Sequence, residues 1–149
     1  MINPVADLLG DAPTHLVRMG LAFAFTLPIA WNREQGTRGA GLRTFPIVAI
    51  TSCGFVLLAI KVLGLNSEDH AYVLKGLLAG IGFIGGGAIL KSGTATHGTA
   101  TAASILNTGV VGASVGFGYY DIGLVLAAVN FLILLSCRAG AEKDRSVHE

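Results

Sequence analysis

The sequence predicts an all-α integral membrane protein, a bundle of five transmembrane helices, and its composition is the first observation behind that prediction. Hydrophobic residues make up 52% of the 149 residues and charged residues only 13%, with a mean hydropathy of +0.67. A soluble domain carries about 25% charged residues, so this chain has too few charges to cover a water-facing surface. The net charge of +1 gives no indication of a nucleic-acid partner. The lipid bilayer is therefore the first partner that we expect.

Five apolar segments, separated by short polar connections, are the second observation. They are about as long as a helix must be to cross the hydrocarbon core of a bilayer, which takes about 20 residues. The expected helices span about residues 15–31, 44–64, 72–90, 96–117 and 122–137. They form a transmembrane domain over residues 15–137, between an outer N-terminal segment, residues 1–14, and a polar cytoplasmic tail, residues 138–149.

The charges of the connecting segments predict an orientation, because lysine and arginine concentrate on the cytoplasmic side of a membrane. Alternate connections and the tail place seven basic residues on one side: Arg33, Arg38, Arg43, Lys91, Arg138, Lys143 and Arg145. The other side carries Asp7, Asp11, Glu68, Asp69 and Asp121. We therefore expect the N-terminus outside and the C-terminus in the cytoplasm. A four-span arrangement, with residues 15–31 lying on the membrane surface, is the alternative.

The stretch from Gly76 to Gly118 is rich in glycine and holds 12 of the 21 glycines, with no Asp or Glu. In a bilayer, glycines spaced four residues apart let neighbouring helices approach closely. Such pairs are Gly76/Gly80, Gly82/Gly86 and Gly112/Gly116. We expect glycine-rich packing between the third and fourth helices through Gly82, Gly86, Gly112 and Gly116. The contact lies either within one chain or between the chains of a homodimer, which we favour because five short helices leave few internal partners.

Enzymatic motifs are matched only in part. Gly80–Gly85 fits the letters GxGxxG, but a dinucleotide site also needs a preceding strand and an acid about 20 residues on, and the next acid is Asp121. Leu90 replaces the glycine that precedes the lysine of a P-loop. No HExxH, CxxC or paired acids occur. We expect no enzymatic activity, no catalytic residues, no cofactor and no metal site.

Three stretches, taken together, resemble the MgtC/SapB family of bacterial inner-membrane proteins over residues 15–137. The first is Arg18 followed by NREQGTRGAGLRT, in which Arg33, Glu34, Gly41, Leu42, Arg43 and Thr44 match the family pattern. The second is GIGFIGGGAILKSG and the third HGTATAASILNTGVVGASVGFG, which begin at Gly80 and His97. Asn32 departs from the family's usual glutamate, and Leu106 from its usual aromatic residue. With only a dozen residues after the fifth helix, we expect a short member lacking the family's C-terminal soluble domain.

The resemblance implies a role in magnesium homeostasis or adaptation to low magnesium, and in the regulation of membrane proteins. The family is also associated with virulence. A further inner-membrane protein is then an expected partner. The alternative function is a small oligomeric transporter or channel for a cation or small solute, although the five spans contain no Asp or Glu of the kind that carriers use.

Two groups of residues are the candidate sites. The first is the loop after the first helix, with Arg33, Glu34, Arg43 and Thr44, where Glu34 is expected to pair with an arginine and fix the loop near His97. The second is a polar lining in the fourth helix: Thr101, Ser104 and Asn107. These three side chains either line a hydrated path or form hydrogen bonds between helices, and we favour the bonds.

Overall fold

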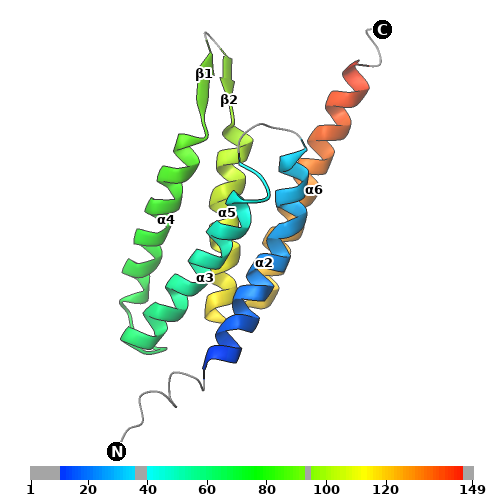
Figure 1. Ribbon diagram of the computed structural model, residues 1–149. Coiled ribbons are helices and arrows are strands. Elements are labelled where there is room, and N and C mark those ends of the chain that lie inside the picture. The colour runs from blue at the N-terminus through cyan, green and yellow to red at the C-terminus, as the bar shows by residue number, and fades with distance from the viewer. Residues whose placement is uncertain (1–10, 36–39, 93–94, 146–149) are drawn as a thin grey trace, which may run out of the picture.

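The computed structural model describes residues 11–35, 40–92 and 95–145, and within these ranges it contains five helices and one short hairpin (Figure 1). The helices are α2 (Ala12–Glu34), α3 (Thr44–Leu63), α4 (His70–Gly87), α5 (Thr99–Phe117) and α6 (Tyr120–Arg145). Strands β1 (Leu90–Ser92) and β2 (Ala95–His97) pair antiparallel, with Leu90 opposite His97. The helical fold and the number of helices agree with the sequence prediction.

The hairpin between α4 and α5 was not predicted, since apolar helices were expected to run to residue 90 and from residue 96. Helix α4 instead ends at Gly87 and α5 begins only at Thr99. Gly98, the N-cap of α5, has φ +86°, a left-handed conformation that glycine adopts without strain. A side chain at Gly98 would also overlap the Ala88 carbonyl oxygen. The chain therefore leaves the helical path on both sides of the hairpin.

Helix ends differ from the expected bounds at both termini. Helix α2 begins at Ala12, three residues early, with a proline at its start, where the missing N–H costs nothing. Helix α6 continues to Arg145, so most of the segment expected as a polar tail is helical. That segment, RAGAEKDR, is rich in Ala, Glu, Lys and Arg, which favour helix even outside an apolar environment.

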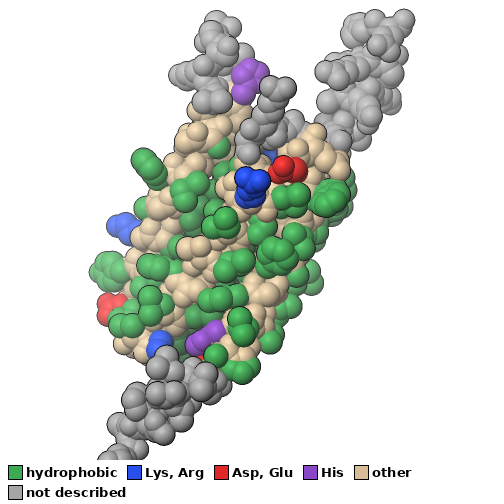
Figure 2. Space-filling view, viewed as in Figure 1, with side chains coloured by type: hydrophobic (Ala, Val, Ile, Leu, Met, Phe, Trp, Pro, Cys, Tyr) green, Lys and Arg blue, Asp and Glu red, His purple; other side chains and the backbone are tan. Residues whose placement is uncertain are grey.

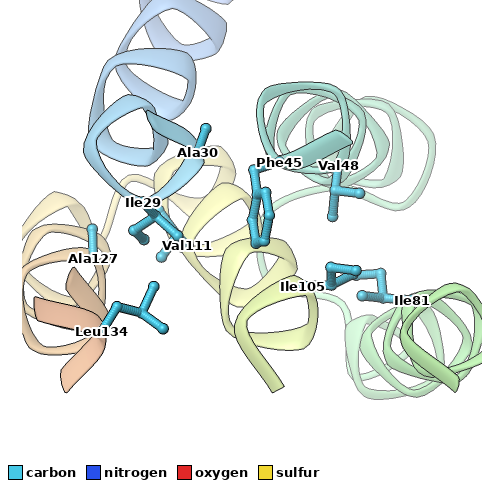
Figure 3. Close-up of a cluster of buried hydrophobic side chains, with 9 residues drawn as sticks. All are labelled: Ile29, Ala30, Phe45, Val48, Ile81, Ile105, Val111, Ala127 and Leu134. Carbon is cyan, nitrogen blue, oxygen red and sulfur yellow. The ribbon is translucent and has the colours of Figure 1, made fainter. Parts of the chain in front are cut away.

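Helix α5 lies at the centre of the bundle and packs against α2, α3, α4 and α6. More than half of its residues are buried: Thr101, Ser104, Ile105, Thr108, Gly109, Val111, Gly112, Ala113, Val115 and Gly116. Helix α4 lies at the edge, and only its Ile81 and Gly85 are buried. All five helices contribute to one buried cluster around α5, which contains Ile29, Ala30, Phe45, Val48, Ile81, Ile105, Val111, Ala127 and Leu134 (Figure 3).

The bundle has two ends, which we call the hairpin end and the opposite end. The hairpin, the 40–43 loop and the last turns of α6 lie at the hairpin end (Figure 1). At the opposite end Lys61 forms an ion pair of 2.7 Å with Asp11 and so links α3 to the start of α2. His70, at the start of α4, contacts the Gly64 carbonyl through Nε2 at 2.7 Å and packs edge-on against Phe117.

Large apolar side chains are exposed on every helix, including Val17, Ile47, Phe83, Leu106 and Val129. Figure 2 shows such side chains across the middle of one face, with charged and histidine side chains toward the two ends and along one edge. In water such a surface would favour aggregation or binding. By length and composition, α3 and α5 are long and apolar enough to cross a membrane, and Tyr120–Ser136 of α6 is a shorter apolar stretch.

Candidate functional site

The loop that follows α2 is held by Glu34, the last residue of that helix. The Glu34 carboxylate accepts a hydrogen bond of 2.8 Å from the backbone N–H of Leu42. Gly41 lies so close to this carboxylate that a side chain at position 41 would overlap Glu34 Oε2. The glutamate and the Gly41-Leu42 pair of the sequence motif therefore form one local structure.

Arg33, the preceding residue, connects α2 to the first turn of α5. Its guanidinium donates a hydrogen bond to the Thr101 hydroxyl, and Thr101 is buried. The first turn of α5 contains no acidic residue. Because the N-terminus of a helix carries partial positive charge, Arg33 adds to an already electropositive region. The contact is therefore a hydrogen-bonded link between helices and does not neutralise the helix dipole.

We call Arg33, Glu34, Gly41, Leu42 and Thr101 the motif junction, because it joins the first and third of the sequence motifs. The expectation that the loop lies against the start of the fourth predicted helix agrees with this arrangement, but Arg33 makes the link. Glu34 bonds to backbone, and Arg43 is exposed, with no ion pair within residues 11–35, 40–92 and 95–145. Arg43 is the N-cap of α3, and Thr44 is its first residue.

The predicted polar lining of α5 is hydrogen bonded to neighbouring helices. Ser104 donates to Asn130 Oδ1 of α6 at 3.1 Å, and the Asn107 side-chain amide reaches the Leu126 carbonyl at 3.4 Å. Thr101 accepts from Arg33, as described above. Thr108, one turn after Ser104, donates to the Ser104 carbonyl at 2.8 Å. The contacts of Thr101, Ser104 and Asn107 correspond to the interhelical bonding that the sequence analysis favoured, whereas the Thr108 bond lies within α5.

Arg18 has a structural role that sequence reasoning missed. Its guanidinium donates a 2.9 Å hydrogen bond to the Gly116 carbonyl, near the C-terminus of α5. The last carbonyls of a helix have no partner within the helix, and a cation there is favoured by the helix dipole. Arg18 and Arg33 thus hold α5 against α2 at its two ends. The available signal was the position of a charged residue inside an apolar segment, which usually indicates an internal partner.

The four glycines predicted to pack between the third and fourth helices divide into two pairs. A side chain at Gly112 would overlap the Ala49 carbonyl oxygen, and one at Gly116 would lie 2.8 Å from Val56 Cβ. Both glycines thus pack against α3, the second predicted helix, and the predicted partner is wrong. At Gly82 and Gly86, an added Cβ would meet nothing within 4 Å in this chain.

The close contact between α4 and α5 is made by other glycines. A Cβ at Gly85 would lie 3.1 Å from the Ala102 carbonyl oxygen, and one at Gly109 would overlap the end of Ile81. Neither glycine belongs to the predicted pairs. Within the part of the chain that the structure describes, no group of three or more His, Cys, Asp or Glu side chains could hold a metal ion.

A helical bundle with exposed apolar side chains on every helix and partly buried polar contacts at both ends of its central helix has the characteristics of a helical membrane protein. Residues 19–142 match the MgtC family, and the chain belongs to that family. It is 36% identical over 143 residues to Protein SrpB of Synechococcus elongatus, covering 88% of this chain and 76% of SrpB. No solved structure matches.

Two further relatives are longer than this chain. The putative magnesium transporter YhiD of Escherichia coli is 30% identical over 125 residues, which cover 80% of this chain and 58% of YhiD. Protein MgtC of Brucella abortus is 36% identical over 119 residues, which cover 76% of this chain and 49% of that protein. The chain thus matches about half of the length of these two relatives.

Proposed function

We propose that all five helices cross the bacterial inner membrane, with the N-terminus in the periplasm and the hairpin end in the cytoplasm. Exposed apolar side chains on each helix support five spans, α2 and α4 included. An 18-residue helix such as α4 is about 27 Å long, close to the roughly 30 Å hydrocarbon core. Arg33 and Arg43 lie at the hairpin end, and exposed Tyr72, Tyr119 and Tyr120 at the opposite end suit a membrane interface.

The orientation is tested with single cysteines at Ser67, between α3 and α4, and at Ser92 in β1, after replacing Cys53 and Cys137 with Ala. We expect a membrane-impermeant thiol reagent to label the Ser67→Cys protein in intact cells, and the Ser92→Cys protein only after the membrane is opened. If only the Ser92→Cys protein were labelled in intact cells, the orientation would be the opposite of the one proposed.

We propose further that the protein is a non-enzymatic member of the family that acts in magnesium homeostasis, through regulation of another membrane protein. The motif junction is the observation that supports this proposal. It joins two separate family motifs at the end we assign to the cytoplasm, where Arg43 is exposed beside it. An arginine there can donate paired hydrogen bonds to an acidic group of a partner.

The functional test compares Arg43→Ala with Lys143→Ala in a strain that lacks the chromosomal gene. Both changes remove one positive charge from the proposed cytoplasmic side, but Lys143 lies near the end of α6, far from the motif junction in sequence. We expect Arg43→Ala to lower growth in limiting magnesium by several-fold and Lys143→Ala to have little effect. If the two variants were expressed equally and gave the same growth, Arg43 would serve only as an orientation signal.

A small magnesium transporter is the second candidate, because the relative YhiD carries the description putative magnesium transporter. The buried polar side chains of α5 would then line the path. Magnesium uptake into liposomes with the purified protein distinguishes the candidates. Uptake above that of empty vesicles, lost on changing Ser104 or Asn107 to Ala, would favour transport over regulation.

We also propose a homodimer, whose contact uses the outward glycines of α4. Gly82 and Gly86 lie one turn apart and meet nothing within 4 Å in one chain. In a bilayer such a pair allows a second helix to approach closely.

A further inference from the structure

A groove of about 320 Å³ lies between α3 and α4 and is almost entirely apolar. On the α3 side it is lined by Ile47, Val48 and Phe55, and on the α4 side by Gly76, Gly80 and Ile84. A Cβ added at either glycine would meet nothing within 4 Å, so the space in front of α4 is open. Ser52 also lines the groove, and its hydroxyl donates to the Val48 carbonyl at 2.7 Å.

We propose that this groove holds one acyl chain of an anionic phospholipid, whose phosphate is bound near Arg43. The proposal goes beyond the proposed function, but it rests on the membrane placement described there. The phospholipid comes from the leaflet on the hairpin side of the bilayer.

The length of the groove fits one leaflet. Its lining runs from Ile47, in the first turn of α3, to Phe55, and the eight steps along the helix between these residues rise about 12 Å. One leaflet supplies about half of the roughly 30 Å hydrocarbon core, or about 15 Å. The groove therefore begins near the interface at the hairpin end and stops near the bilayer midplane.

The volume favours an acyl chain over a helix. A helix with its side chains is about 10–12 Å wide, so a 12 Å length occupies about 1,000 Å³, more than the groove can hold. An apolar cavity of about 150 Å³ accommodates benzene, so the groove has room for a stretch of one hydrocarbon chain. A second copy of the protein would leave most of such a helix outside the groove.

Charge at the hairpin end of the groove selects the headgroup. Arg43 lies one helical turn before Ile47, whose N–H contacts the Arg43 carbonyl at 3.4 Å. Its side chain is exposed and forms no ion pair within the described ranges. A guanidinium at the membrane interface binds a phosphate through paired hydrogen bonds. An anionic lipid thus satisfies both the apolar groove and the arginine beside it.

The test uses a fluorescent reporter inside the groove. In the full-length protein, Trp31, the single tryptophan, is replaced by Phe, and Phe55→Trp introduces an indole into the groove lining. The protein is reconstituted in dioleoylphosphatidylcholine vesicles with increasing amounts of brominated phosphatidylglycerol or brominated phosphatidylcholine. We expect quenching of the indole fluorescence to show that the groove prefers phosphatidylglycerol to phosphatidylcholine by about fivefold. This is the contribution of one arginine near an anionic surface. Arg43→Gln should remove this preference, and equal quenching by the two lipids before that change would contradict charge selection.

Gly80→Leu fills the groove and should lower quenching by both lipids at least twofold, as should Gly76→Leu if the first variant fails to fold. Gly20→Leu is the control, because Gly20 lies on α2, outside the groove and outside the proposed dimer contact, and a Cβ there meets nothing within 4 Å. Equal quenching in Gly80→Leu and Gly20→Leu would overturn the lipid site. Dissociation of a dimer by Gly80→Leu would also overturn it. Thiol labelling decides the orientation separately, so failure of the membrane placement and failure of the lipid site give different results.

Discussion

Helices α4 and α5 are both glycine-rich, yet most of the glycines in α4 have surroundings that differ from those in α5. In α5, Gly109, Gly112 and Gly116 are buried, and a side chain at each would overlap or press on a neighbouring helix. In α4, Gly76, Gly80, Gly82 and Gly86 meet nothing within 4 Å, and only Gly85 is packed. The same residue type at the same four-residue spacing therefore serves a central helix and a peripheral helix.

The difference shows that the function of a glycine depends on where its helix lies in the bundle. A central helix needs glycine so that several neighbours can approach its backbone at once. A peripheral helix leaves its small faces open, where lipid or a second chain can contact them. Spacing in the sequence indicates that a close approach is possible, but it does not identify the partner.

The largest expected effect contrasts Gly112→Leu with Gly82→Leu. Gly112→Leu forces a side chain into the Ala49 backbone of α3, which cannot move aside as a flexible side chain would. We expect a loss of about 3 kcal/mol or more, at the upper end of overpacking effects, measured by thermal unfolding in detergent. Gly82→Leu should leave monomer unfolding unchanged and lower the yield of crosslinked dimer.

A control glycine for that experiment must have free space around it. Gly123 lies outside the predicted spacings but is unsuitable, because a Cβ there would lie 3.3 Å from Val115. Gly20, with nothing within 4 Å, is a second suitable control position. Unchanged unfolding of Gly112→Leu would mean that α5 does not pack on α3 through this glycine. If Gly82→Leu left the yield of crosslinked dimer unchanged, this result would contradict the proposed dimer contact through α4.

The second prediction concerns the link that holds the start of α5 to α2. Thr101→Val keeps the shape of the side chain but removes the acceptor of the Arg33 guanidinium. Hydrogen bonds to charged groups contribute about 1.5–3 kcal/mol, so we expect a loss in that range in the free energy of unfolding. Thr99→Val, at an exposed position two residues earlier, is the matched control. Equal stability of the two variants would mean that the motif junction does not hold α5 in place.

Hydrophobicity and charge were enough to predict the five helices, because long apolar runs between polar connections leave few alternatives. They were not enough for the hairpin, since Leu90, Thr96 and His97 fell within the expected helices. The left-handed backbone at Gly98, where α5 begins, is not marked by hydrophobicity or charge. The family motifs located the loop at Arg33 and Glu34 but did not indicate that Glu34 accepts a hydrogen bond from backbone. The bond from Glu34 to the Leu42 N–H depends on the path of the loop, which side-chain types alone do not specify.

The glycine partners were missed for a related reason. Gly112 and Gly116 face α3 because α5 is central, and a helix becomes central through its contacts with all of the others. No single segment of the sequence contains that information. The role of Arg18 was missed as well, because its bond to Gly116 depends on α2 and α5 lying side by side.

The smallest expected effect is at the opposite end, where the Asp11–Lys61 pair holds α2 to α3 and no comparable pair reaches α4 within the described residues. The hydrogen bond and the charge of Lys61 lower the pKa of Asp11 below its ordinary value of 3.8. A lowered pKa means that the pair stabilises the fold above about pH 4 and that this contribution disappears as the pH falls through the pKa of the folded state. Both side chains are more than half exposed, so solvent and salt weaken the interaction. We expect Asp11→Asn to lower the melting temperature at pH 7 by less than about 2 °C, and this effect to shrink as the pH falls below 3.8 and in 1 M salt. A difference that neither acid nor salt reduced would assign the effect to the helix N-cap at Asp11, and the ion pair would then contribute nothing to holding α2 against the central helices.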